Sequence, residues 1–218
     1  MTTEIKLPFD EEYVSSFSKD MKEPSWLSEL RLNALDKVDG LELPKPDKTK
    51  IDKWNFTQFG KHIVQSEDYA SLEALPEDVK KLVNIEEKDQ NLYIQRNNRP
   101  TILSVSKELQ EKGVVFVDIF TAAREYGDLL QKYYMNTAVK PDEHKLTALH
   151  AALVNGGVFL YVPKNVQVES PVQAVFIHDE KEANLFNHVI VVAEENSSVT
   201  YVENYISTVE SADSIFNI

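Results

Sequence analysis

The sequence predicts an α+β fold. A mainly helical α/β domain, residues 1–154, precedes the first coils of a stacked β-strand solenoid, residues 155–218. Apolar residues at helical spacing dominate the first part, whereas short β-branched runs separated by polar turns fill the second. Between them lies the run Asn155-Gly156-Gly157, where the backbone must turn sharply or take positive φ. We therefore place the domain boundary at this run.

Composition and charge restrict the possible classes of function. The 218 residues are 42% hydrophobic, which is enough for a buried core, and their net charge of −13 repels phosphate backbones. We therefore expect no binding to nucleic acid. The absence of cysteine excludes disulfides and thiolate ligands from this chain. No apolar run has the length of a signal peptide or a membrane span, so we expect a cytoplasmic protein without membrane association.

Two amphipathic helices are expected near the N-terminus. Residues 10–21 and 26–39 both carry apolar residues at helical spacing. Asp10 can cap the first helix and Ser25 the second, because short oxygen-bearing side chains accept the free N–H groups of a first turn. The spacing places Arg31 on the outward face of the second helix.

A proline- and lysine-rich connector, residues 41–53, follows these helices. It lacks a continuous apolar face, so we expect it to be exposed. Trp54 and Phe56 then lie two positions apart, which in an extended stretch places both rings on one side. We expect both rings to anchor the connector to the core rather than to bind a ligand.

The middle of the chain mixes short helices and strands. We expect residues 101–117 to form a compact β-α-β unit. The expected helices are residues 76–83, 106–112, 126–135 and 141–154, and the expected strands are residues 91–96, 101–105 and 114–117.

The C-terminal segment reads as a series of strands. Their centres suggest a coil of roughly 12 to 15 residues. Two architectures fit such spacing, an antiparallel sandwich or a β-helix, and the lack of tight Asn-Gly or Asp-Gly hairpins between the strands favours the β-helix. The expected strands are residues 158–162, 166–168, 172–178, 188–193 and 199–206.

The end of the sequence predicts a continuation. Stacked coils bury their core only when each has neighbours, yet residues 215–218 are mostly apolar and include no cap. We therefore expect the parent protein to extend beyond residue 218. We also expect the unpaired edge of residues 199–206 to make this chain weakly stable or self-associating.

The residues that could carry chemistry are few. The five histidines, His62, His144, His150, His178 and His188, show no metal-binding spacing. His144 and His150 should lie on opposite sides of their helix, whereas His178 and His188 could meet on adjacent coils. Satisfied edge histidines are nevertheless commoner than metal pairs. There is no phosphate-binding loop or nucleophile motif. We assign no catalytic, cofactor-binding or metal-ligating residue and expect no enzyme.

Several stretches resemble the SufB/SufD family of iron-sulfur cluster assembly scaffolds. The most specific are Tyr161-Val-Pro-Lys164 and Val168-Glu-Ser-Pro171, which lie in a stretch, residues 155–176, that is similar to the start of the family's β-helix. Residues 145–152 resemble the helix that leads into it. Residues 23–27 and 54–57 are similar to the N-terminal region of the SufD branch.

The resemblance implies a scaffold that works with a SufB-like protein and a SufC-like ATPase. It also implies a right-handed parallel β-helix, of which these residues are only the start. This chain alone would bind no cofactor, because the assembled complex handles the iron-sulfur cluster. The family's later coils and its ATPase-docking helical domain have no counterpart here, so no cluster-linked position can be carried over.

Two other hypotheses remain from the residues alone. A β-helix enzyme acting on acidic polysaccharide would need basic residues along its sheet, but residues 151–218 contain only Lys164 and Lys181. A helical adaptor would bind its partner through residues 1–150. Deletion of residues 1–150 distinguishes the adaptor from the scaffold, because it should abolish partner binding by an adaptor.

Overall fold

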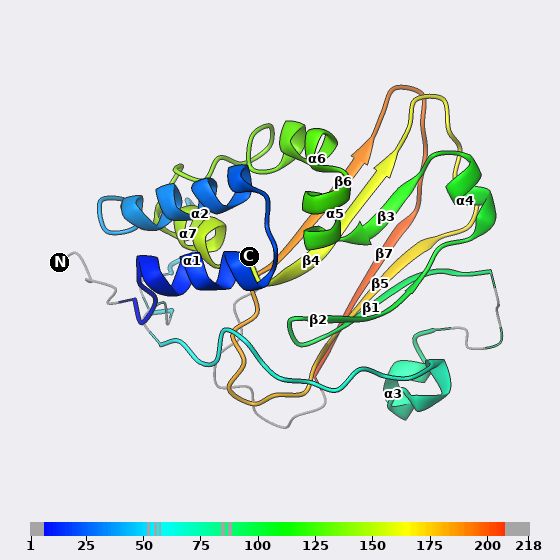
Figure 1. Cartoon of the computed structure of the whole chain (residues 1–218), viewed down its shortest axis with the longest axis horizontal. Coiled ribbons are helices and arrows are strands. Elements are labelled where there is room, and N and C mark those ends of the chain that lie inside the picture. The colour runs from blue at the N-terminus through cyan, green and yellow to red at the C-terminus, as the bar shows by residue number, and fades with distance from the viewer. Residues whose placement is uncertain are drawn as a thin grey trace.

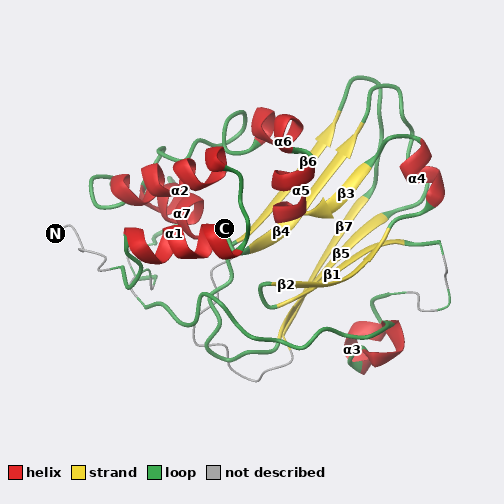
Figure 2. Cartoon of the chain, viewed as in Figure 1, coloured by secondary structure: helices red, strands yellow, loops and turns green. Residues whose placement is uncertain are grey.

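The computed structural model describes most of the chain (Figures 1 and 2). The described residues form a mixed α+β structure with seven α-helices and two small mixed sheets. Residues 215–218, on which the expected continuation of the chain was based, lie outside the described residues. The described residues are 7–51, 53–54, 56, 58–83, 86 and 89–207.

Helices come first along the chain, helices and strands are mixed in its middle, and four strands follow one another at its end. The helices are α1 Glu11–Asp20, α2 Ser25–Lys37, α3 Glu77–Lys80, α4 Lys107–Glu111, α5 Ile119–Glu125, α6 Gly127–Tyr133 and α7 Lys145–Leu153, with a 3-10 helix at Leu72–Ala74. The strands are β1 Asn91–Arg96, β2 Arg99–Ser104, β3 Val115–Asp118, β4 Gly156–Val162, β5 Val172–His178, β6 Asn187–Ala193 and β7 Tyr201–Ser207.

The helix caps correct two sequence-based expectations. Asp10 caps α1 as predicted, with its side chain accepting a first-turn N–H. Ser25 does not cap α2, because Pro24 holds the extended cap position and Ser25 is already helical. α7 begins after His144, whose ring nitrogen accepts an N–H in a capping box, rather than at Pro141.

Helix α5 was not predicted. Only Asp118 separates the apolar run of β3 from Ile119 and Phe120, so a single polar residue marks the change from strand to helix. The signal was Asp118, whose carboxylate accepts the backbone N–H groups of Phe120 and Thr121. This N-cap ends the strand and starts the helix.

The predicted β-α-β unit in residues 101–117 is wrong. β2 pairs antiparallel with β1, whereas β3 pairs antiparallel with β4 in the other sheet. The chain therefore crosses from one sheet to the other through α4, and this short helix does not return it beside β2.

The strands β4 to β7 alternate between two sheets, ordered β2-β1-β5-β7 and β3-β4-β6. β4 runs parallel to β6 with Gly156 opposite Asn187, and β5 runs parallel to β7 with Val172 opposite Tyr201. Parallel partners thus lie about 30 residues apart. The predicted coil of roughly 12 to 15 residues is wrong, because one repeat contains two strands. The β-helix itself stays a prediction.

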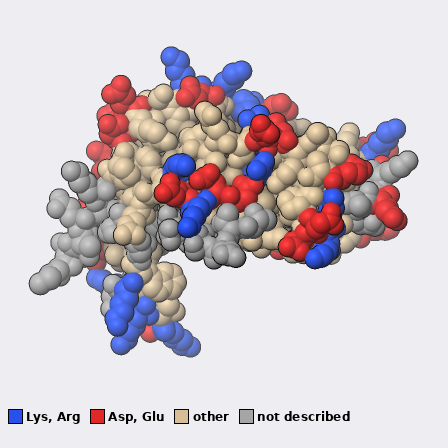
Figure 3. All heavy atoms as spheres, turned by 90° about the horizontal axis from the view of Figure 1, so that it is seen from below, with Lys and Arg blue, Asp and Glu red and all other residues tan. Residues whose placement is uncertain are grey.

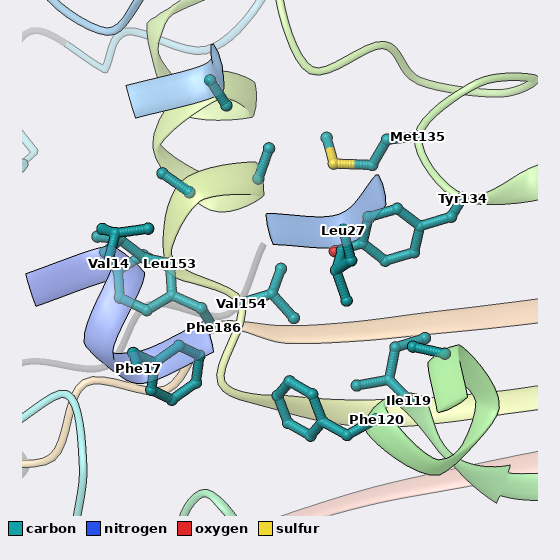
Figure 4. Close-up of a cluster of buried hydrophobic side chains, with 14 of the residues drawn as sticks. Val14, Phe17, Leu27, Ile119, Phe120, Tyr134, Met135, Leu153, Val154 and Phe186 are labelled. Carbon is teal, nitrogen blue, oxygen red and sulfur yellow. The ribbon is translucent and has the colours of Figure 1, made fainter. Parts of the chain in front are cut away.

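Three apolar clusters divide the structure into layers. One lies between the two sheets and contains Tyr93, Leu160 and Phe176. A second lies between the β3-β4-β6 sheet and helices α1, α2, α5 and α7, and Figure 4 shows its side chains converging from these elements. The third joins Val79 of α3 to the outer face of β1 and β5. Helices therefore cover the outer face of the β3-β4-β6 sheet, and α3 with its flanking residues covers the outer face of β1 and β5.

The connector differs from its prediction at one ring. Phe56 is buried, but Trp54 is 60% exposed, so only Phe56 anchors the connector to the core. Neither Trp54 nor Phe56 lies in a strand, so the alternation that would place both rings on one side does not apply.

Gly157 fixes the approach of β4 to β6. Its φ is +128°, and a Cβ there would fall on the backbone of His188 in the neighbouring strand. Only glycine fits this conformation and this distance. The domain boundary placed at this run stays a prediction. No helix among the described residues combines the length and apolar character needed to cross a membrane.

Candidate interaction surface

The strands β6 and β7 form one end of the two sheets, and each has a single sheet neighbour among the described residues. Their inward positions follow from the register. Val191 lies opposite Leu160, and Tyr205 lies opposite Phe176; Leu160 and Phe176 belong to the cluster between the sheets. We call the inward residues Val189, Val191, Tyr201, Glu203 and Tyr205, together with the free strand edges, the β6–β7 surface.

The β6–β7 surface combines exposed apolar side chains with strand edges that no other described strand covers. Val191 is 42% exposed and Tyr205 is 47% exposed, whereas Leu160 behind them is fully buried. The ring of Tyr205 stacks on Phe176 with centroids 4.8 Å apart. An edge of free N–H and C=O groups beside exposed apolar side chains can take up a further strand.

A carboxylate lies among these apolar groups. The Tyr201 hydroxyl donates to Glu203 Oε2 at 2.8 Å. Burial, followed by the Glu203 carboxylate, raises the pKa of both Tyr201 and Tyr205 well above the usual range, so both phenols stay neutral. A carboxylate can accept several hydrogen bonds. A strand that covers this surface is therefore favoured if it brings a donor to Glu203.

Metal ligands do not gather at this surface. Within the part of the chain that the structure describes, no three His, Asp or Glu side chains form a group that could hold a metal ion. The chemistry of the β6–β7 surface is accordingly that of strand pairing and apolar burial.

The five histidines occupy different parts of the fold. His144 caps α7, and His178 ends β5 in the sheet away from the helices. His178 and His188, which could have met on adjacent coils, do not, because β5 and β6 belong to different sheets. His188 Nδ1 instead lies 2.7 Å from Nε2 of His150 on α7. His62 contacts the backbone of the residue that ends α7.

Three of these histidines are neutral because they are buried. Burial lowers the pKa of His62 and of His188 to about 4. Burial also lowers the pKa of His150 well below its usual range, and the neighbouring His188 and the Arg31 charge add to this effect. All three therefore remain uncharged at neutral pH.

Arg31 is the residue that the sequence pattern misplaced most clearly. Instead of facing outward it is fully buried, and its Nη2 lies 2.7 Å from Glu23 Oε1. Its guanidinium also donates to the carbonyls of Ala152 and Val154 at the end of α7. Helical periodicity treats arginine as a surface residue, but a buried carboxylate and helix-terminal carbonyls satisfy its donors. The signal in the sequence was Glu23, eight positions earlier.

A shallow pocket of about 350 Å³ lies between α2 and α6. Trp26, Leu30 and Lys37 line one side, and Gln131 and Pro141 line the other. Its lining combines one indole with scattered polar groups, without a concentration of charge that would specify a ligand.

Charged side chains are interspersed over the face shown in Figure 3. Elsewhere among the described residues, Arg96 pairs with Asp179 at 2.6 Å, and Lys61 pairs with Glu180 at 3.2 Å. The Arg96 pair is partly buried, whereas the more exposed Lys61 pair contributes little to stability. The mixture of signs keeps the negative net charge from forming one continuous field on this face.

Comparison with known proteins identifies relatives of the whole chain. A family profile described as "SufBD protein N-terminal region" matches residues 11–174. The chain is 61% identical over 218 residues to the iron-sulfur cluster assembly protein SufD of Bacillus subtilis, a match that covers 100% of this chain and 50% of that protein. An iron-sulfur cluster assembly SufBD family protein of Staphylococcus epidermidis is 31% identical over 214 residues, covering 94% of this chain and 45% of the relative. The chain spans about half the length of the curated relatives it matches.

Proposed function

The chain belongs to the SufBD family of iron-sulfur cluster assembly proteins, and on this premise we propose that it is a non-catalytic scaffold subunit of the SUF assembly complex. It works with a SufB-like protein and a SufC-like ATPase in the cytoplasm. The observation that carries the proposal is the 61% identity to a SufD protein over the full 218 residues.

A scaffold role agrees with the side-chain chemistry. The sequence contains no cysteine, and an iron-sulfur cluster is normally held by thiolates. The polar groups that are most buried, such as Arg31, His150 and Asn155, make contacts between elements of the fold. We assign none of them to catalysis or to a resident cofactor. The cluster is cargo of the assembled complex.

We further propose that the two sheets are the first coils of a right-handed parallel β-helix. The alternation of β4 to β7 between two sheets supports this, as do the parallel partners about 30 residues apart. Parallel crossovers are right-handed in nearly all proteins. The β6–β7 surface then receives the next coil, which the relatives have the length to supply.

Affinity capture tests the scaffold role. The complete product of the gene that encodes this chain is tagged and co-expressed with the SufB-like and SufC-like proteins of the same organism. We expect the tagged protein, the SufB-like protein and the SufC-like protein to elute together in fixed proportion. A tagged protein that brings down neither partner contradicts the proposal.

A pair of matched variants shows whether the β-helix matters for this assembly. Tyr205→Lys places a charge on the β6–β7 surface, and Tyr126→Lys places the same charge on a tyrosine between α5 and α6 that is 37% exposed. We expect the first variant to lose most of the captured partners and the second to retain them. If both variants capture the partner proteins equally, the β6–β7 surface is not needed for assembly.

A further inference from the structure

We infer that His150 and His188 form an acid-sensitive joint that holds helix α7 on strand β6 and releases it when the pair takes up protons. This role is separate from assembly with partner proteins. It concerns the contact between the helical layer and the β3-β4-β6 sheet, which no other histidine pair among the described residues bridges.

The joint is a direct contact between two imidazoles. His150 Nε2 and His188 Nδ1 lie 2.7 Å apart, and the ring of Tyr134 lies against His188 with centroids 4.7 Å apart. His150 is only 3% exposed. A hydrogen bond between two neutral imidazoles needs one N–H donor and one free lone pair. The pair therefore holds together only while one of the two facing nitrogens is unprotonated.

Protonation removes this bond. If the acceptor nitrogen gains a proton, two N–H groups face each other at hydrogen-bond distance and repel. The other nitrogen of His150, Nδ1, is buried without a hydrogen-bond partner, so an imidazolium there gains no compensating acceptor. The charged form of the pair is thus disfavoured by geometry as well as by burial.

The neighbouring ionisable groups do not offset that charge. Arg31 on α2 adds positive potential at His150. Glu23, before α2, uses both carboxylate oxygens on Arg31 and Ser18. Tyr134, after α6, stays neutral because burial raises its pKa above the usual range.

Release of the pair would loosen a larger contact. α7 carries His150 in its last turn, and carbonyls at its C-terminal end accept hydrogen bonds from the guanidinium of Arg31. The residues of α7 also belong to the cluster that covers β4 and β6. Opening at the histidine pair therefore exposes the outer face of β6 and frees one end of the Arg31 contact.

Hydrogen exchange of backbone amides measures this opening. The wild-type protein is compared at pH 7 and pH 5, after correction for the intrinsic exchange rate at each pH. Because an exposed imidazole has a pKa of about 6.5 and folded His188 one of about 4, release of His188 should increase the opening of α7 and β6 about 20-fold, and release of His150 should add to this increase. Amides of β1, which carries no histidine, serve as the internal reference and should change far less.

A double variant keeps the bond but removes the titration. His150→Gln places an amide near the former Nε2, and His188→Asn places one near the former Nδ1, so H150Q/H188N can still form a hydrogen bond that no proton breaks. It should lose the pH dependence of α7 and β6. His144→Asn, which removes an imidazole but keeps an N-cap, should behave like the wild type.

The outcomes separate the joint from general acid instability. Loss of the pH dependence in H150Q/H188N alone supports the joint. Equal acceleration of α7, β6 and β1 in the wild type overturns it, as does an unchanged pH dependence in H150Q/H188N. If the double variant does not fold, the comparison of α7 and β6 with β1 in the wild type decides.

Discussion

The inner strands β4 and β5 differ in burial from the outer strands β6 and β7, although all four are alike in length and composition. Each of β4, β5, β6 and β7 has seven residues, and all are rich in β-branched or aromatic side chains. β4 and β5 are almost wholly buried, whereas β6 and β7 alternate between half-buried and exposed positions. The inner strands have a sheet neighbour on both sides, and β6 and β7 have one among the described residues. A strand in such a stack is thus buried only when another strand lies on each side of it.

The largest effect is expected where Arg31 joins α2 to the end of α7, just before β4 begins. Arg31→Met should lower the free energy of unfolding by about 4 kcal/mol, because it leaves the Glu23 carboxylate buried without its cation. Denaturant unfolding at pH 7 measures this. The double variant R31M/E23Q should recover part of the loss. An Arg31→Met variant as stable as the wild type would show that the buried ion pair of Arg31 and Glu23 does not stabilise the fold.

A smaller loss is expected where the inner strand meets the outer one. Gly157→Ala should lower the free energy of unfolding by about 3 kcal/mol, because the new Cβ would meet the backbone of His188 and the φ of +128° is strained for alanine. Gly40→Ala is the matched control. Its nearest neighbour would be a backbone oxygen of Lys37 at 3.7 Å, so its stability should change little. Equal effects of the two variants would contradict the close approach of β4 and β6.

The comparison is sharpest at two valines that face each other in the register. Val158 on β4 is fully buried, and its partner Val189 on β6 is half-buried. Val158→Ala should cost about 2.5 kcal/mol and Val189→Ala about 1 kcal/mol, because the second removes fewer packed contacts. Chemical denaturation of both variants gives the difference. Equal costs would mean that β6 is as well covered as β4.

The smallest effect on stability is expected at the surface itself. Tyr205→Lys should change the unfolding free energy by less than about 1 kcal/mol, because the side chain is 47% exposed. It should nevertheless reduce self-association of the 218-residue chain, which we expect through the β6–β7 surface. Sedimentation velocity over a range of concentrations measures this. A wild-type chain that stays monomeric throughout would rule out such association.

The local pattern of the strands could be read from the sequence, but their partners could not. The predicted ranges for β4 to β7 agree with the structure to within two residues, because β-branched runs between polar turns are a local signal. The fifth predicted strand, residues 166–168, is wrong, because only an isolated bridge from Gln167 to Ser198 forms there. Sheet membership depends on contacts about 30 residues apart, so the coil length and the β-α-β unit were wrong.

The buried polar contacts could not be predicted from the periodicity of apolar residues, for a related reason. The positions of Arg31 and of the pair His150 and His188 depend on groups that only the tertiary fold brings close. A helical pattern reports the usual location of a residue type, and these residues are exceptions because each has a buried partner. The family resemblance rested on local motifs and was confirmed.

The most direct test of the account compares the exchange of β4 and β5 with that of β6 and β7 in two proteins. The first is the 218-residue chain, and the second is this chain fused to the part of the Bacillus subtilis relative that it does not match. The account predicts slow amide exchange of β4 and β5 in both, and exchange of β6 and β7 that slows at least about tenfold in the fusion. Strands β6 and β7 that exchange as slowly as β4 and β5 in the 218-residue chain, or that are unaffected in the fusion, would contradict it.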